Sequence, residues 1–185
     1  MVKDILKDTE DQMKKTVEAF RKDLASMRAG RANPALLEKV LVPYYGVPTP
    51  VNQLATVAVP EPRLLVIQPW DKTQLSSIER AIMKSDLGIM PTSDSNVIRL
   101  VIPQLTQERR QEIVRTMRKK AEEQRVLVRN SRRDAKEMIE ELEDSGDISE
   151  DDSHRGMDDL QKLTDKHTKE LDQVLLAKEK ETMEV

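Results

Sequence analysis

The chain of 185 residues contains no cysteine, and it has only one tryptophan, one phenylalanine and two tyrosines. The lack of cysteine excludes disulfide bonds, thiolate metal ligands and thiol nucleophiles. With aromatic residues at 2% and charged residues at 35%, the composition suits long exposed helices better than one large globular core. Long apolar runs and leader patterns are also missing, so we expect a cytoplasmic protein without a membrane partner.

Proline is absent from both ends of the chain, because all nine prolines lie between Pro34 and Pro103. Proline interrupts helix interiors, so this distribution predicts two helical arms around a turn-rich insert. We therefore expect one discontinuous domain, 1–30 with 105–185, and a second domain at 31–104. The predicted fold class is α+β: an elongated three-helix bundle with an inserted small β/α/β domain.

Apolar periodicity predicts three amphipathic helices in the arms. The first ends near Gly30 and has the buried stripe Met13, Val17, Phe20, Leu24 and Met27. The second covers about 106–145 and has the seam Met117, Ala121, Gln124, Val128, Ser131, Ala135, Met138 and Leu142. The third opens at a capping box beginning with Ser149 and has the seam Met157, Leu160, Thr164, His167, Leu171, Val174 and Lys178. None of them can bury its stripe alone, which favours a bundle built from both ends of the chain.

The insert has the shorter period of strands. Its runs at 39–45, 54–59, 63–68 and 96–102 are rich in β-branched residues and bounded by proline or glycine. Residues 73–86 read as a helix between the last two runs. If the arms pack together, the junctions near 30–31 and 103–104 lie close in space, so we expect them to form a hinge.

Charge is strongly segregated along the chain although the net charge is only -3. Residues 106–136 hold eleven basic and five acidic side chains, whereas 137–152 hold nine acidic and no basic ones. At about 100° per residue, one line along the second arm's long helix carries a basic stripe. The stripe consists of Arg118, Arg125, Arg129, Arg132 and Lys136, with Glu122 close to the same line.

Two interpretations of the basic stripe stay open. It is either a solvated helix face with local ion pairs, such as Glu122 with Arg118 or Arg125, or a ridge that binds phosphates. Arginine suits the second role because its planar fork grips phosphate oxygens. The stripe has no interleaved aromatic residues, which favours the backbone of structured RNA over stacking on single-stranded bases.

The sequence offers no set of catalytic residues. The only histidines, His154 and His167, read as a surface residue and a packed residue. Phosphate-binding glycine loops, metalloprotease helices and nucleophile elbows are missing. We expect neither an enzyme nor a bound cofactor or metal.

Several motifs, in order along the whole chain, resemble ribosome recycling factor. They are Arg28-Ala29-Gly30-Arg31-Ala32-Asn33-Pro34, Tyr44-Tyr45-Gly46 before Pro50, Pro69-Trp70-Asp71-Lys72, the junction from Pro103 to Arg110, Val128 to Ala135, and Ile148 to Asp152. The resemblance implies an L-shaped, two-domain monomer of tRNA-like dimensions that enters the post-termination ribosome. Its partners would be the rRNA of the large subunit and elongation factor G, whose GTP hydrolysis drives the subunits apart.

Residue roles follow from the resemblance together with the basic stripe. The candidate rRNA contacts are Arg28, Arg31, Arg110, Arg118, Arg125, Arg129, Arg132 and Arg133. The candidate hinge residues are Gly30, Arg31, Pro103, Gln104, Leu105 and Thr106.

Two other functions remain open. A coiled-coil adaptor or co-chaperone would use the helices as a dimerisation seam, so its solution state would be a dimer. A ribosome-silencing factor would share the basic stripe but would not need the translocase or GTP.

Overall fold

The chain divides into two compact units. The structure is a computed structural model that describes residues 1–27 and 30–184. The helical unit comprises Met1–Leu24 and Glu112–Val185, and the insert unit comprises Ala25–Gln111. The helices and the small sheet confirm the α+β class. The domain boundaries that we predict from the sequence, 30/31 and 104/105, remain a prediction.

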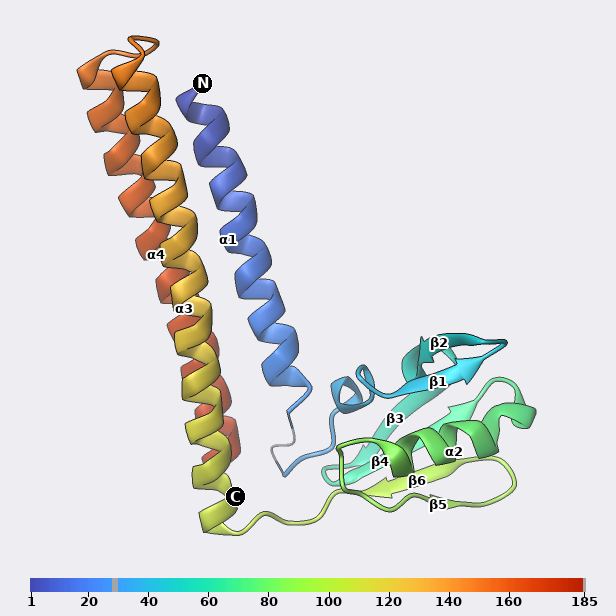
Figure 1. The fold of residues 1–185 in the computed structure, drawn as a ribbon. Helices are drawn as coiled ribbons and strands as arrows, with labels where there is room; N and C mark the ends of the chain where they lie inside the picture. Colours follow the sequence, from blue (N-terminus) through green and yellow to red (C-terminus); the bar gives the residue numbers. More distant parts are fainter. Residues whose placement is uncertain (28–29, 185) are drawn as a thin grey trace. The chain divides into compact units, whose positions relative to one another are not determined.

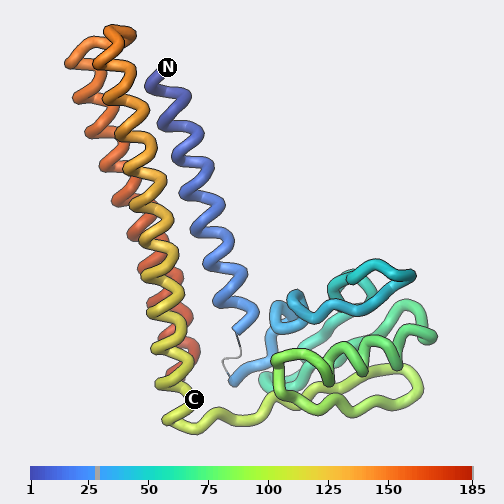
Figure 2. The backbone as a smooth tube through the Cα atoms, in the orientation of Figure 1, coloured from blue at the N-terminus to red at the C-terminus, as the bar shows by residue number. Residues whose placement is uncertain are grey.

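Three helices run side by side in the helical unit: α1 (Val2–Ala25), α3 (Gln107–Asp144) and α4 (Glu150–Met183), as Figures 1 and 2 show. They meet closely at Gly156 of α4. A Cβ atom there would lie 2.8 Å from Val2 Cγ1 and 3.5 Å from Ile139 Cδ1, so only glycine fits without a shift. The bundle is thus built from both ends of the chain.

The α1 stripe is confirmed, because Met13, Val17, Phe20 and Leu24 are buried. Its end is not where we expected it. The helix stops at Ala25, five residues before Gly30, and Met27 lies beyond it. Gly30 has a φ of 82°, so it serves the connecting segment and does not cap the helix.

The predicted α3 seam holds over most of its length and then shifts. Met117, Ala121, Val128 and Ala135 are buried, but the next buried residue is Ile139 rather than Met138. The prediction followed a strict seven-residue repeat, whereas an α-helix turns once every ~3.6 residues and drifts from that repeat. Met138 is consequently exposed.

The α4 seam is largely confirmed and is unusually polar. Leu160, Thr164, His167, Leu171 and Lys178 are buried as expected. Two positions differ, because Gly156 and Leu175 are buried in place of the half-buried Met157 and Val174. Thr164 Oγ1 donates to the Leu160 carbonyl at 2.8 Å, which satisfies its hydroxyl within the helix. The seam therefore supplies less apolar burial than a row of leucines would.

The turn between α3 and α4 is specified by its sequence. Gly146, with a φ of 78°, donates to the Glu143 carbonyl, and Asp147 donates to the Leu142 carbonyl, each at 2.9 Å. This is the Schellman arrangement that ends a helix. Ser149 Oγ then accepts from the Asp152 amide at 3.1 Å and caps α4, as predicted. Hydrogen bonds with Ser149, and next to them Arg155, hold the pKa of Asp152 below its ordinary value.

The insert unit contains a four-stranded antiparallel sheet. Its order is β3 (Ala55–Glu61), β4 (Leu64–Pro69), β6 (Ile98–Val101) and β5 (Thr92–Ser93). The helix α2 (Leu75–Lys84) packs Ile78 and Ile82 into a core that includes Leu65 and Ile67. The predicted runs at 54–59, 63–68 and 96–102 are confirmed as β3, β4 and β6, whereas the two-residue β5 was not expected.

Both chain connections of the insert unit are tied to the β3–β4 turn. The Ala32 amide donates to the Pro62 carbonyl, and the Ile102 amide donates to the Arg63 carbonyl, each at 2.8 Å. Beyond these points, Gly30 lies against Leu105, since a Cβ atom on Gly30 would be 3.4 Å from Leu105 Cδ1. The two connecting segments therefore run next to each other where they leave the sheet.

A tight hairpin joins β1 (Leu41–Tyr44) to β2 (Val47–Pro50). Its two turn residues, Tyr45 and Gly46, have φ values of 48° and 80°, the signs of a type I′ turn. Asparagine or glycine is usual at the first position, because a larger side chain is strained at positive φ. The Tyr45 side chain gains little burial in return, since it is 82% exposed and contacts the Tyr44 ring edge-on at 4.5 Å between centroids.

We predict that Tyr45→Asn stabilises the insert unit. Relief of the positive φ is worth about 1 kcal/mol, while the lost ring contact costs about 0.5 kcal/mol on an exposed surface. Denaturant unfolding should show a small gain in the free energy of unfolding. Tyr45→Phe, which keeps both the ring and the strain, is the control and should match the wild type. A less stable Tyr45→Asn protein would contradict the strain.

Candidate nucleic-acid interface

The basic stripe of α3 does not lie on the most exposed face of the helix. Buried residues such as Ala121, Val128 and Ala135 mark the inner face. Arg118 and Arg125 lie roughly a quarter-turn from them, at the border with α4, as ~100° per residue requires. This border position determines what the stripe contacts.

Two stripe arginines pair with carboxylates of α4. Arg118 Nε donates to Glu179 Oε1 at 2.8 Å, and its Nη2 lies 3.4 Å from Glu179 Oε2. Arg125 Nη2 and Nε donate to Asp172 Oδ1 at 2.6 Å and 3.1 Å. These hydrogen bonds raise the pKa of both guanidinium groups. Each arginine is therefore paired with a carboxylate across the helix interface.

Glu122 neutralises part of the stripe within α3. Its Oε1 accepts from Arg129 Nη2 at 2.8 Å, and its Oε2 accepts from Arg125 Nη1 at 3.2 Å. The hydrogen bond from Arg129, and next to it the one from Arg125, hold the pKa of Glu122 below its ordinary value. The expected local pairing is thus present with Arg125, whereas Arg118 turns to α4 instead.

Arg132 differs from the other stripe arginines, because its partner is neutral. Its Nη1 donates to Gln161 Oε1 at 3.3 Å, and Gln161 Nε2 in turn donates to Asp165 Oδ1 at 2.8 Å. In the part of the chain that the structure describes, Arg132 forms no ion pair. Its positive charge is consequently available.

The outward face of α3 carries three further cations, which we call the outer cations: Arg115, Lys119 and Arg133. All three are exposed. Arg133 has only Asp134 nearby, at 3.8 Å, and for Arg115 and Lys119 the described residues show no ion pair. Arg115 and Lys119 lie off the line of arginines that the sequence indicates, so that line does not identify them. Measuring angles from the buried seam would have found them.

The remaining predicted contacts are placed differently. Arg31 is exposed in the connecting segment, and Arg28 lies outside the described residues. Arg110 is only 7% exposed and makes contacts within the protein, so it is not presented to a ligand. The prediction of Arg110 as a surface contact is corrected on this ground.

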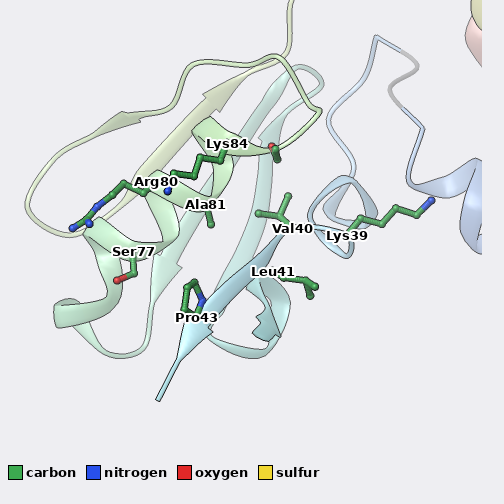
Figure 3. Close-up of a pocket in the computed structure, with 9 residues that line it drawn as sticks. Lys39, Val40, Leu41, Pro43, Ser77, Arg80, Ala81 and Lys84 are labelled. Atoms are coloured by element: carbon green, nitrogen blue, oxygen red, sulfur yellow. The ribbon is translucent and has the colours of Figure 1, made fainter. Parts of the chain in front are cut away.

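The insert unit has a pocket of about 360 Å³ between β1 and α2. Figure 3 shows Arg80 and Lys84 of α2 extending to the same side of it, while Lys39 extends in the opposite direction. The lining residues include Ser77 and Ser85 but neither a carboxylate nor a histidine. They offer no pair of groups for acid–base or nucleophilic chemistry.

Other kinds of site are not formed by the described residues. Among them, no three histidine, aspartate or glutamate side chains gather as metal ligands. Nor does any described helix have the length and apolarity needed to cross a bilayer. His154 is exposed and His167 is buried, as predicted.

A family model described as "Ribosome recycling factor" matches residues 20–183. The chain belongs to this family. It is 68% identical over 185 residues to the ribosome-recycling factor of Syntrophomonas wolfei and 63% identical to that of Heliobacterium modesticaldum, with 100% of each chain covered. The resemblance inferred from the six motifs is thereby confirmed, and the protein is a translation factor by family.

Solved structures of the family share the fold. A solution structure of the ribosome recycling factor matches with a TM-score of 0.81 and 49% identity, over 100% of this chain and 98% of that one. A second match has a TM-score of 0.71 and 42% identity, over 100% of both chains. It is described as models for the T. thermophilus ribosome recycling factor and the E. coli elongation factor G bound to the E. coli post-termination complex.

We predict that Glu122 stabilises the helical unit at neutral pH and loses this effect in acid. Because its folded pKa is lowered, its contribution is present above the unfolded value of 4.5 and disappears as the pH falls through the folded value. Chemical unfolding of Glu122→Gln at several pH values should therefore show a difference from wild type at pH ~7 that shrinks below pH ~4.

Glu123→Gln is the matched control for this experiment. Glu123 is an exposed neighbour on α3, and the described residues show no ion pair for it. The control should not reproduce the pH-dependent difference. A difference that is constant with pH in Glu122→Gln would contradict the role of its charge.

Proposed function

We propose that this protein recycles ribosomes after translation termination by binding large-subunit rRNA through α3. With elongation factor G and GTP hydrolysis, it then promotes separation of the subunits. Family membership supports recycling, and the similar structure that combines a ribosome recycling factor with elongation factor G on a post-termination complex supports the partner. We expect it to act as a binding and force-transmitting factor without chemistry of its own.

The observation that carries the RNA contact is a set of α3 cations without a close carboxylate partner. Among the described residues Arg132, Arg115 and Lys119 form no ion pair, and Arg133 has only the 3.8 Å contact with Asp134. Arg129, shared with Glu122, adds a guanidinium that is 56% exposed. Guanidinium groups without stacking aromatics suit the phosphates of structured RNA. Arg31 and, from the family resemblance, Arg28 are further candidate contacts.

The candidate hinge lies between the two points where the insert unit is pinned. Hydrogen bonds hold Ala32 and Ile102 to the β3–β4 turn, so bending would fall outside them. This leaves Gly30 and Arg31 on one connection and Pro103 to Thr106 on the other, the segments that we predicted. The hinge would let the insert unit move under the push of the translocase.

The decisive experiment is a subunit-splitting assay on post-termination ribosomes. We expect the protein to split them only when elongation factor G and GTP are both present. Splitting without either factor, or ribosome binding that blocks splitting, would favour a silencing function instead. Sedimentation of the protein alone should give a monomer, and a stable dimer would favour a coiled-coil adaptor.

Arg133→Ala serves as the variant that links this function to α3. It should weaken ribosome binding and make the dependence of affinity on salt shallower by about 1 in the log–log slope, because one phosphate contact is lost. Arg21→Ala on α1, where Arg21 pairs locally with Glu18 at 3.5 Å, is the control. Equal affinities and equal salt slopes for the two variants would remove Arg133 from the interface.

We predict that Gln104→Pro slows splitting while leaving ribosome affinity unchanged. A second proline next to Pro103 fixes φ at position 104 and restricts Pro103 to extended conformations. The change costs no observed hydrogen bond, since in the described chain the Gln104 amide has none. Stopped-flow light scattering would measure the rate, with Gln104→Ala as the control. Splitting at the wild-type rate would exclude bending at this segment from the mechanism.

A further inference from the structure

The α3–α4 contacts follow a regular antiparallel register. Between Arg118 and Arg125 the chain advances seven residues along α3, and their partners Glu179 and Asp172 lie seven residues apart in the opposite direction on α4. Seven residues are close to two helical turns, so each step returns to the same side of both helices. One further step leads to Arg132 on α3 and to Asp165 on α4.

At this third position the expected ion pair is not formed. Gln161, one turn before Asp165, lies between the two charged groups. Its carbonyl oxygen accepts from Arg132 at 3.3 Å, and its amide nitrogen donates to Asp165 at 2.8 Å. Glutamine suits this position because its amide offers an acceptor to the cation and a donor to the anion at once.

We propose that Gln161 is a positioning residue for Arg132 that keeps the charge of this arginine free of a carboxylate partner and its guanidinium oriented for phosphate. It does so by giving Arg132 a neutral partner and by engaging Asp165, the carboxylate that the helix register brings opposite Arg132. This inference rests on the proposed function, in which Arg132 contacts rRNA.

The two neighbouring arginines show what happens without such a residue. Arg118 and Arg125 each meet a carboxylate on α4 and use two nitrogens on it. They connect the two helices, and a carboxylate partly offsets the charge of each. On the same interface Arg132 differs from them in that it meets the neutral Gln161 where they meet carboxylates.

The test is a double-mutant cycle of Gln161→Ala and Asp165→Asn. Binding of labelled protein to purified bacterial large ribosomal subunits is measured by fluorescence anisotropy at several salt concentrations. Gln161→Ala frees Asp165 to pair with Arg132, so we expect affinity to fall roughly three- to tenfold and the salt slope to decrease by about 1. Asp165→Asn alone should stay within about twofold of wild type, because Asp165 is bonded to Gln161 and not to Arg132.

The double variant separates positioning from a general structural effect. Gln161→Ala with Asp165→Asn removes the competing carboxylate, so affinity and salt slope should return to within about twofold of wild type. A double variant as weak as Gln161→Ala, or a Gln161→Ala protein that binds like wild type, would overturn the proposal. Circular dichroism and thermal melts of each variant verify that the bundle is intact.

Gln161→Glu provides a second, independent readout. A carboxylate at this position should complete a third cross-helix ion pair, raising the melting temperature while lowering affinity for the subunit. If Gln161 had a purely structural role, the melting temperature and the affinity would change in the same direction, and that outcome would overturn the proposal. Gln173→Glu, an exposed site on α4 about 18 Å along the helix, adds the same charge beyond the screening length and should leave affinity unchanged.

Failure of the proposed function has a different signature. If wild type does not bind the large subunit, or if Arg132→Ala binds as tightly as wild type, then Arg132 is not an rRNA contact. If Arg132→Ala is weak and the cycle shows no coupling between positions 161 and 165, the contact stands and only the role of Gln161 is excluded.

Discussion

The antiparallel register of α3 and α4 is the constraint on which the cationic face depends. The Schellman turn at Gly146 and the cap at Ser149 fix where one helix ends and the next begins. From that turn onward, a step of two turns along α3 and back along α4 brings another pair of side chains close to each other. Because exposed ion pairs contribute only about 0–1 kcal/mol each, the cross-helix pairs follow this register more than they create it. Their larger effect is to decide which arginine charges are offset by a carboxylate.

Much of the fold follows from local patterns that sequence can express. Proline confinement separates the arms from the insert, and apolar spacing identifies the α1 stripe and most of both seams. The errors have local physical causes. Met138 was assigned to the seam because a strict heptad was extended past the point where helix geometry had drifted to Ile139. Gly30 was taken as a helix stop, although its positive φ serves the connecting segment after α1 has ended.

The candidate site is harder to predict, because it depends on pairs that are distant in sequence. Arginine spacing on α3 identifies a basic stripe, but whether Arg118 is free is decided by Glu179, 61 positions away. Nothing local separates it from Arg132, which meets a neutral amide instead. Arg110 likewise belongs to a basic cluster in sequence and is buried in the structure. Helix register and burial, rather than composition, distinguish arginines without a carboxylate partner from arginines that are paired or buried.

Stability and binding impose opposite demands on the α3–α4 interface. Its seam includes small and polar residues, so further ion pairs would be an available means of holding the helices together. Each pair would also neutralise a cation that phosphate recognition requires, since counterion release scales with the free positive charges presented. The interface meets both demands by position: carboxylates oppose Arg118 and Arg125, and an amide opposes Arg132. Proteins commonly give up available stability where function needs an unsatisfied group, and here the unsatisfied group is a charge.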